Sequence, residues 1–201
     1  MKKMIIAALA GLALLAAPAA EAAVSTLEQT LGRTVIARPV LEGLRDEAGQ
    51  KVEQDLDKIV CELTEVVAKH EGAAGRLDYF VVSDTDMYTS LLLETSWTDS
   101  KGRETKHLQS AFYEKLRGNR VRLEDMLERQ LKPAQLEPLK EHFGVRTLDG
   151  SLTLTAADCG KIKRVPEDFV VDEAGKLYLL FQPLELTDKT AEPVLLLIAN
   201  P

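Results

Sequence analysis

The sequence predicts an α+β fold, in which an antiparallel β-sheet packs against one long N-terminal helix and one or two shorter helices. Apolar residues recur at intervals of three and four from Leu44 to Val67, which is the spacing of an amphipathic helix. Alternate residues from Met87 to Trp97 form two distinct faces, which is typical of a half-buried antiparallel strand. Short apolar runs between turn residues fill the last third of the chain and indicate further strands.

The N-terminal half begins with a predicted strand at 34–37, where β-branched residues dominate. The long helix covers 44–67, and the glycines that follow it mark its end. The strand at 87–97 is joined by turn residues to a second strand at 105–116.

The C-terminal half mixes short helices with strands. In chain order, the predicted elements are a helical turn at 123–127, a helix at 133–143, a strand at 151–155, a hairpin at 168–186 and a final strand at 193–198. The final strand is apolar on both faces, which indicates that both faces are covered. Pro183 cannot donate a ladder hydrogen bond, so the strand before it should end there.

Residues 1–22 have the pattern of a secretory signal peptide. Two lysines precede an apolar segment from Met4 to Leu15, and Ala20 and Ala22 form a small-residue cleavage site. We therefore expect a periplasmic or secreted protein. Charges interrupt every later apolar run, so we expect no membrane insertion after cleavage of the signal.

The remaining chain, 23–201, has the size of a single α+β module. Its N-terminal strand–helix part covers about 34–110, and its C-terminal part covers about 111–199. An apolar content of 45% is enough for a packed core. The net charge of −7 argues against a nucleic-acid ligand, which needs clustered Lys and Arg, and against docking on anionic lipid.

The chain contains two cysteines, Cys61 and Cys159. An even number of cysteines in an exported protein predicts a disulfide. Cys61 also lies away from the apolar stripe of the long helix, where a buried free thiol would be expected. The alternative is that both thiols stay reduced.

Three stretches resemble a family of exported bacterial modules. The stretch at 36–56 resembles the strand, proline and helix that open the family's fold, and 112–127 resembles its strand, glycine turn and helix start. The stretch at 167–186 is similar to its closing hairpin. The family comprises the RsiV/PdaC-type extracytoplasmic domains, whose C-terminal half is known as DUF3298. The resemblance covers roughly 34–198, although Gln182 and Leu184 stand where the family usually has Asn and Tyr.

The resemblance implies an extracytoplasmic α+β module and a limited range of functions. RsiV-like ectodomains bind lysozyme as a signal, and PdaC-like proteins carry a separate deacetylase domain. Neither a sigma-binding segment nor a deacetylase domain is expected in this sequence. The resemblance therefore implies the module alone.

The histidines and paired aspartates do not predict a metal site or a cofactor. His70, His107 and His142 lack the spacing of metal ligands. Asp84 and Asp86 could begin a calcium loop, but the required glycine and distal glutamate are missing. We therefore expect no cofactor and no metal.

The sequence also provides no catalytic motif. Ser83, Ser90 and Ser110 lack the G-x-S-x-G setting of a nucleophilic serine, and Cys61 has no histidine nearby in sequence. We therefore expect a protein that is not an enzyme. The alternative is a hydrolase of envelope polymer, which needs a site near four polar residues, namely Asp84, Asp86, Glu94 and His107.

Trp97 and Tyr88 are the candidate ligand-binding residues, because aromatic side chains on a sheet can form a binding platform. Aromatic residues on strands also serve as core or cross-strand pairs. The sequence therefore favours an exported, non-catalytic binding module whose ligand is an envelope glycan or an envelope protein such as a lysozyme-like hydrolase. A purely structural envelope protein is the third hypothesis.

Overall fold

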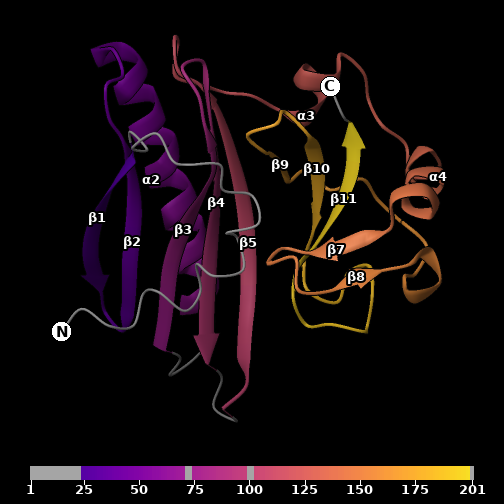
Figure 1. Ribbon diagram of the computed structural model, residues 1–201. Coiled ribbons are helices and arrows are strands. Elements are labelled where there is room, and N and C mark those ends of the chain that lie inside the picture. The colour runs from indigo at the N-terminus through magenta and orange to yellow at the C-terminus, as the bar shows by residue number, and fades with distance from the viewer. Residues whose placement is uncertain (1–23, 71–73, 99–101, 200–201) are drawn as a thin grey trace.

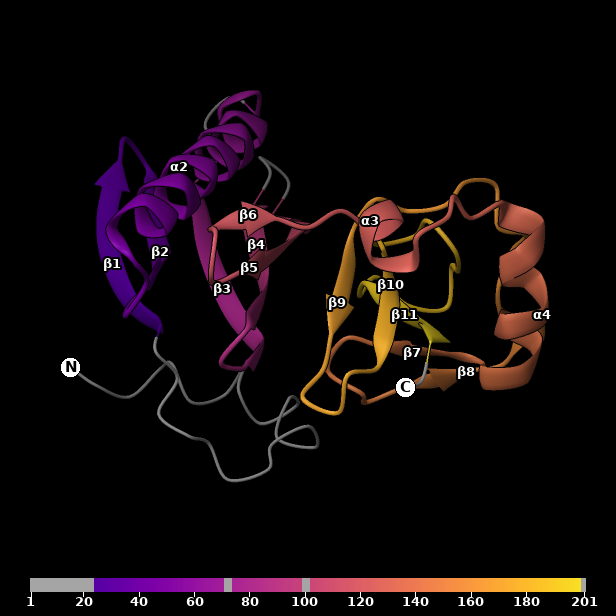
Figure 2. The same cartoon turned by 90° about the horizontal axis from the view of Figure 1, so that it is seen from above.

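The computed structural model describes residues 24–70, 74–98 and 102–199. These residues form four layers, in the order helix α2, a six-stranded sheet, a five-stranded sheet, and the helices α3 and α4 (Figures 1 and 2). The α+β class is therefore confirmed. The predicted signal peptide, 1–22, lies outside the described residues.

The first sheet contains six strands in sequence order. They are β1 (Val24–Leu31), β2 (Thr34–Leu41), β3 (Ala74–Asp84), β4 (Tyr88–Thr98), β5 (Glu104–Glu114) and β6 (Asn119–Arg120). Neighbouring strands are antiparallel except for β2 and β3, which are parallel. The helix α2 (Asp46–Ala68) connects this parallel pair, because parallel neighbours need a crossover.

Helix α2 packs its apolar stripe against one face of the first sheet, as its periodicity predicts. Its buried side chains are Ala48, Val52, Leu56, Ile59, Val60, Leu63 and Val67. None of the helices in the described ranges is long and apolar enough to cross a membrane.

The second sheet is antiparallel and packs on the other face of the first, over β3, β4 and β5. Its strands, in order across the sheet, are β8 (Thr153–Leu154), β7 (Val145–Thr147), β11 (Val194–Ala199), β10 (Leu177–Phe181) and β9 (Phe169–Val171). A 3-10 turn, η2 (Ala156–Asp158), follows β8. The short helices α3 (Leu123–Leu127) and α4 (Pro133–Phe143) pack on its outer face.

The strands thus form two sheets where the sequence predicted one. In β4, Leu91 and Leu93 pack toward α2, whereas Leu92 packs between the two sheets. The strand at 87–97 is therefore buried on both faces, although its alternation predicted one. Residues 24–120 build the first sheet and α2, and the predicted division at residue 110 falls within β5.

The C-terminal strands match their predictions closely. Strand β10 ends at Phe181, just before Pro183. In β11, Leu196 packs toward the outer helices and Leu195 packs against the first sheet, so both faces are covered.

The structure contradicts the predicted disulfide. Both cysteines are free: Cys61 is exposed on α2, and Cys159 packs against the core between the second sheet and the outer helices. A disulfide needs Cα atoms within about 7 Å, but here both sheets separate the two thiols. The position of Cys61 off the apolar stripe reflects exposure to solvent.

Candidate functional site

Three loops meet at one end of the first sheet and surround an open hollow of about 530 Å³. They are the β2–α2 loop at 42–45, the β3–β4 turn at 86–88 and the β5–β6 turn at 114–116. The β3–β4 and β5–β6 turns are adjacent because the register of β4 and β5 places Tyr88 opposite Glu114. Loops that a rigid sheet holds together are a common place for binding residues.

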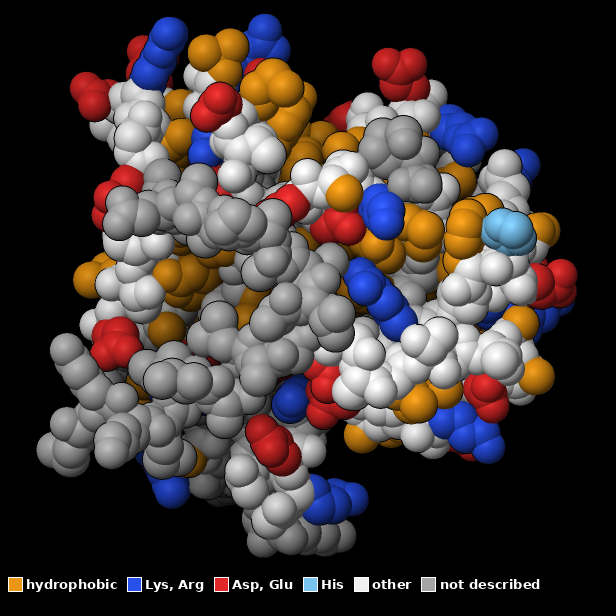
Figure 3. All heavy atoms as spheres, in the orientation of Figure 1, with side chains coloured by type: hydrophobic (Ala, Val, Ile, Leu, Met, Phe, Trp, Pro, Cys, Tyr) orange, Lys and Arg blue, Asp and Glu red, His pale blue; other side chains and the backbone are white. Residues whose placement is uncertain are grey.

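Exposed apolar side chains line this hollow. Met87 is 66% exposed, Leu116 is 59% exposed and Tyr88 is 36% exposed. The Tyr88 ring stacks on Phe112 with 5.2 Å between ring centroids, which holds the ring at the wall of the hollow. Figure 3 shows hydrophobic side chains gathered at this upper end of the first sheet. Exposed apolar side chains that cluster in this way indicate an interaction surface.

The rim of the hollow is charged. Glu42, Asp86 and Glu114 contribute carboxylates. Lys115 also lies on the rim, but its ammonium group is 2.8 Å from the carboxylate of Asp84, so its charge is already compensated. Arg45 also lines the hollow, so three carboxylates and two cations surround the apolar side chains.

Trp97 does not belong to this surface, which corrects the prediction that it contacts a ligand. Its side chain is buried and stacks on His70 with 4.8 Å between ring centroids. Tyr88 and Trp97 lie at opposite ends of β4, about 30 Å apart for a strand of this length. The two aromatic residues cannot form one platform.

The residues of the hydrolase hypothesis also lie apart. Asp84 ends β3 and Asp86 lies in the following turn, at one end of the sheet. Glu94 lies near the middle of β4, where its carboxylate is 4.0 Å from the ammonium group of Lys106. His107 lies on β5 beside α2.

Glu94 and His107 point to opposite faces of the first sheet. Glu94 is paired across the strands with Leu108, which packs between the two sheets. His107 directly precedes Leu108 on β5 and lines a hollow beside α2. Because successive side chains of a strand alternate between faces, the four residues cannot converge on one substrate. In addition, the described residues contain no group of three His, Cys, Asp or Glu side chains that could hold a metal ion.

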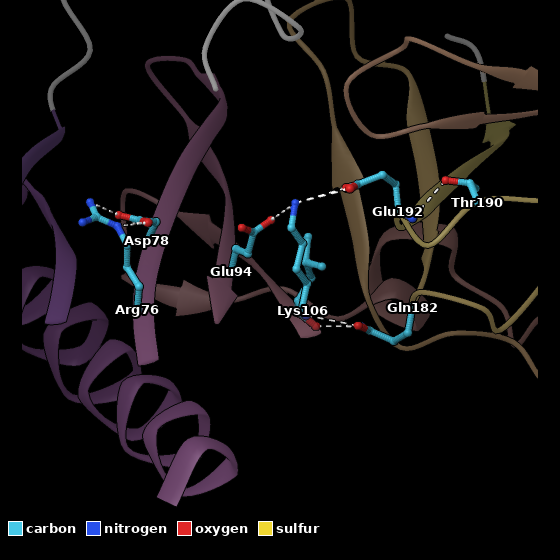
Figure 4. Close-up of polar contacts among 8 residues, drawn as sticks. Arg76, Asp78, Glu94, Lys106, Gln182, Thr190 and Glu192 are labelled. Carbon is cyan, nitrogen blue, oxygen red and sulfur yellow. Dashed lines mark hydrogen bonds and ion pairs between the residues drawn. The ribbon is translucent and has the colours of Figure 1, made fainter. Parts of the chain in front are cut away.

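A polar seam joins the two sheets near Glu94 (Figure 4). The ammonium group of Lys106 lies between the carboxylates of Glu94 and Glu192, and its distance to Glu192 is 3.3 Å. Burial raises the pKa of Glu94, and Lys106 opposes that shift. Burial disfavours charge on Lys106, but the two carboxylates outweigh it and raise the pKa of Lys106. This pair of glutamates therefore holds a lysine at the junction of the sheets.

Side chains also close the free edge of β5. The Gln182 amide accepts a hydrogen bond from the Leu108 N–H at 3.1 Å and donates one to the Leu108 carbonyl at 2.7 Å (Figure 4). Asp168 accepts from the Ser110 N–H at 2.7 Å, and Arg120 donates to the Ser110 carbonyl at 2.6 Å. These bonds occupy the groups that another strand would otherwise pair with.

The three serines without a nucleophile motif have a structural role, because they close the edge of β9. Ser83 donates to the Val171 carbonyl at 2.7 Å, and Ser90 accepts from the Val171 N–H at 3.2 Å. Ser110 accepts from the Phe169 N–H at 3.0 Å. All three serines are buried and come from three neighbouring strands of the first sheet. The first sheet thus satisfies the backbone groups at the edge of the second.

A second hollow of about 750 Å³ lies between α2, β5, α3 and residues 165–169. Two of its lining residues, Arg120 and Asp55, form an ion pair of 3.8 Å, and the Asp55 carboxylate also accepts a hydrogen bond from the buried hydroxyl of Tyr113 at 2.7 Å. Burial raises the pKa of Tyr113 above its ordinary range, so this hydroxyl stays a donor. Asp55, Arg120 and Tyr113 therefore already bind one another and connect α2 to the first sheet.

No protein-family model matches the sequence, and no curated protein matches it. Solved structures are similar in fold, among them the following two. A DUF3298 family protein from Pseudomonas aeruginosa PAO1 aligns with a TM-score of 0.54 and 11% identity, over 86% of this chain and 88% of that one. A member of the same family from Bacteroides fragilis aligns with a TM-score of 0.51 and 10% identity, over 87% of this chain and 88% of that one.

The chain has a DUF3298-like fold. The resemblance at 36–56, 112–127 and 167–186 is thereby confirmed at the level of the fold. At these identities, the likeness carries no information about a ligand.

Within this DUF3298-like fold, Met87 and Leu116 are the residues that sequence analysis missed. The sequence placed Met87 in the strand at 87–97 and Leu116 at the end of the strand at 105–116, but both lie in turns, where their side chains are exposed. Their proximity follows from the pairing of β4 with β5, which only the structure shows. Tyr88 was predicted because it is aromatic, and it lines the hollow with them.

We expect Asp168 to make the stability of this DUF3298-like fold depend on pH. Burial raises the pKa of Asp168 above the ordinary value of 3.8, against its hydrogen bonds from Ser110. A raised folded-state pKa means that the protonated form is favoured on folding, so stability falls as pH rises through that pKa. Asp168→Asn keeps an oxygen acceptor for Ser110 and removes the titration. Urea unfolding would be measured at about pH 3 and about pH 7. Between these two values, as pH rises, the wild type should lose more of its free energy of unfolding than the variant. An equal change in the two proteins would contradict this.

Proposed function

We propose that this protein is an exported, non-catalytic binding module that contacts another protein of the cell envelope through the hollow at Tyr88. The observation that carries the proposal is the cluster of three exposed apolar residues, Met87, Tyr88 and Leu116, on two adjacent turns. The N-terminal signal pattern supports export. The scattered positions of Asp84 and His107 argue against the hydrolase alternative.

The chemistry of the hollow favours a protein over a glycan. Aromatic residues and methionine are enriched in the buried centre of protein interfaces, with polar groups around them. The hollow has this arrangement, since carboxylates of Glu42, Asp86 and Glu114 surround the apolar side chains. The net charge of −7 favours a partner with a basic surface, because opposite charge speeds association. A lysozyme-like envelope hydrolase is one partner of this kind.

The proposal can be tested with defined ligands. Purified protein would be immobilised and exposed to a panel of purified lysozymes and, separately, to purified peptidoglycan. We expect saturable binding of a protein, with affinity lowered at least about tenfold by the double substitution Met87→Ser and Leu116→Ser. Both residues are mostly exposed, so the substitutions should leave the melting temperature unchanged.

The control is Leu152→Ser, which replaces another exposed leucine, outside the hollow. If the control and the double variant lower the affinity equally, the assigned surface is contradicted. Binding to peptidoglycan alone would contradict a protein partner.

A further inference from the structure

Strand β1 is an unprotected edge of the first sheet. It pairs only with β2 among the described residues, and seven of its eight residues are exposed. Figure 1 shows it at the outer left edge of the sheet, with no other labelled element beyond it. An exposed edge strand can pair with another strand unless the protein blocks it.

Two other edges of the molecule are blocked by side chains, as described for β5 and β9. In the described part of the chain, no side chain bonds to the backbone of Thr26, Glu28 or Thr30. These are the residues whose N–H and C=O groups point away from β2. The reason is that Leu31 and Thr34 flank a two-residue turn, which fixes the odd-numbered residues of β1 as those bonded to β2.

Two leucines on β1 remain unburied in the single chain. Leu27 is 48% exposed and Leu31 is 64% exposed. Leu27 is paired with Arg38, whose guanidinium group lies 2.9 Å from the carboxylate of Asp57 on α2, so Leu27 faces the α2 side of the sheet. Leu31 lies four residues further along the strand, which is two repeats of the alternation, and so it lies on the same face. Helix α2 packs over β2 to β6, which leaves these leucines of β1 uncovered.

We propose that two copies of this chain form a dimer by antiparallel pairing of their β1 strands. One register fits both the backbone and the side chains. It pairs Glu28 of one copy with Thr30 of the other, which joins outward-pointing backbone groups on both strands. It also places Leu27 of each copy opposite Leu31 of the other, which makes two leucine pairs on the α2 side of the sheet. The two-fold axis then lies beside Gln29.

The competing registers are less favourable. A register centred on Glu28 places two carboxylates directly opposite each other, which destabilises a strand pair. A register centred on Leu27 makes one leucine pair in place of two. The chosen register buries four leucines and leaves each Glu28 opposite a neutral Thr30. A pairing of this kind extends the six strands of each copy into one continuous sheet.

Sedimentation velocity over a range of protein concentrations tests the dimer. We expect a species of twice the monomer mass, and we expect Glu28→Pro to raise the dimer dissociation constant at least about tenfold. The substitution removes an outward N–H that the β1–β2 hairpin does not use, so the melting temperature should not change. Leu27→Lys should weaken the dimer to a similar degree, whereas Leu152→Lys, at an exposed leucine elsewhere, should not. A monomer at all concentrations, or a dimer that survives Glu28→Pro, would overturn the proposal.

Cysteine cross-linking tests the register. In a Cys61→Ser background, Gln29→Cys should form a disulfide-linked dimer, because Gln29 faces its own copy across the two-fold axis in a close, non-hydrogen-bonded pair. Leu27→Cys alone should not cross-link, but a mixture of Leu27→Cys and Leu31→Cys proteins should. Cross-linking of Leu27→Cys with itself would overturn the register in favour of the one centred on Leu27.

Discussion

Replacement of Gly118 by alanine is expected to cost about 2–4 kcal/mol of stability. Gly118 lies in the β5–β6 turn with φ of 68°, a left-handed conformation that alanine adopts at a cost. A Cβ atom at this position would also lie 2.2 Å from the carbonyl oxygen of Ala48, which belongs to the backbone of α2. Because backbone cannot rotate aside as a side chain can, the turn or the helix must move.

The matched control is Gly150→Ala. Gly150 has a similar φ of 70°, but no atom lies within 4 Å of a Cβ built there. This variant should lose only the conformational term, about 1 kcal/mol. Urea unfolding of both variants separates the close approach to α2 from the cost of the left-handed backbone. Equal losses in the two variants would show that the turn does not press against α2.

The double substitution Ser90→Ala and Ser110→Ala is expected to cost about 2–5 kcal/mol. Each serine hydroxyl accepts a hydrogen bond from a buried N–H of β9, that of Val171 for Ser90 and that of Phe169 for Ser110. Alanine cannot accept a hydrogen bond, so both N–H groups would be left buried and unpaired. The penalty for such groups exceeds the net value of the hydrogen bonds themselves.

Ser96→Ala is the control for this prediction. Ser96 also lies on β4, but its side chain makes no hydrogen bond within the described ranges. We expect a change within about 0.5 kcal/mol, which is usual for a site without such features. Thermal or urea unfolding measures both effects. A double variant as stable as the control would contradict the role of the serines in joining the two sheets.

The sequence predicted best those elements that have a strong apolar pattern. Helix α2 and strands β10 and β11 have strong apolar patterns, and they occur where those patterns lie. Strand β1 was missed because nearly all of it is exposed, so no apolar alternation marks it. Strand β3 was missed as well, since Arg76 and Asp78 interrupt its apolar residues and bind each other at the surface.

The second sheet could not be foreseen from local patterns. Serines at Ser83, Ser90 and Ser110 read as polar positions that face water, yet the second sheet buries them. Their partners lie 59 to 88 residues further along the chain, in β9. A local pattern gives the face on which a side chain lies, but not which other segment covers that face.

The candidate site was predicted only in part for the same reason. Tyr88 was selected as a strand aromatic, and it borders the hollow. Trp97 was selected by the same criterion, but its partner is His70 at the end of α2. Aromatic identity therefore does not distinguish a contact residue from a packing residue. Burial distinguishes them, and it depends on contacts distant in sequence.

The most direct test of the proposed function is site-specific photo-cross-linking. A photoreactive amino acid would replace Met87 in one variant and Leu152 in another, and each would be irradiated with an envelope extract and analysed by mass spectrometry. If the hollow at Tyr88 binds an envelope protein, the variant at Met87 will give one dominant protein adduct and the variant at Leu152 will not. No adduct at Met87, or the same adducts at both positions, would contradict binding through this hollow.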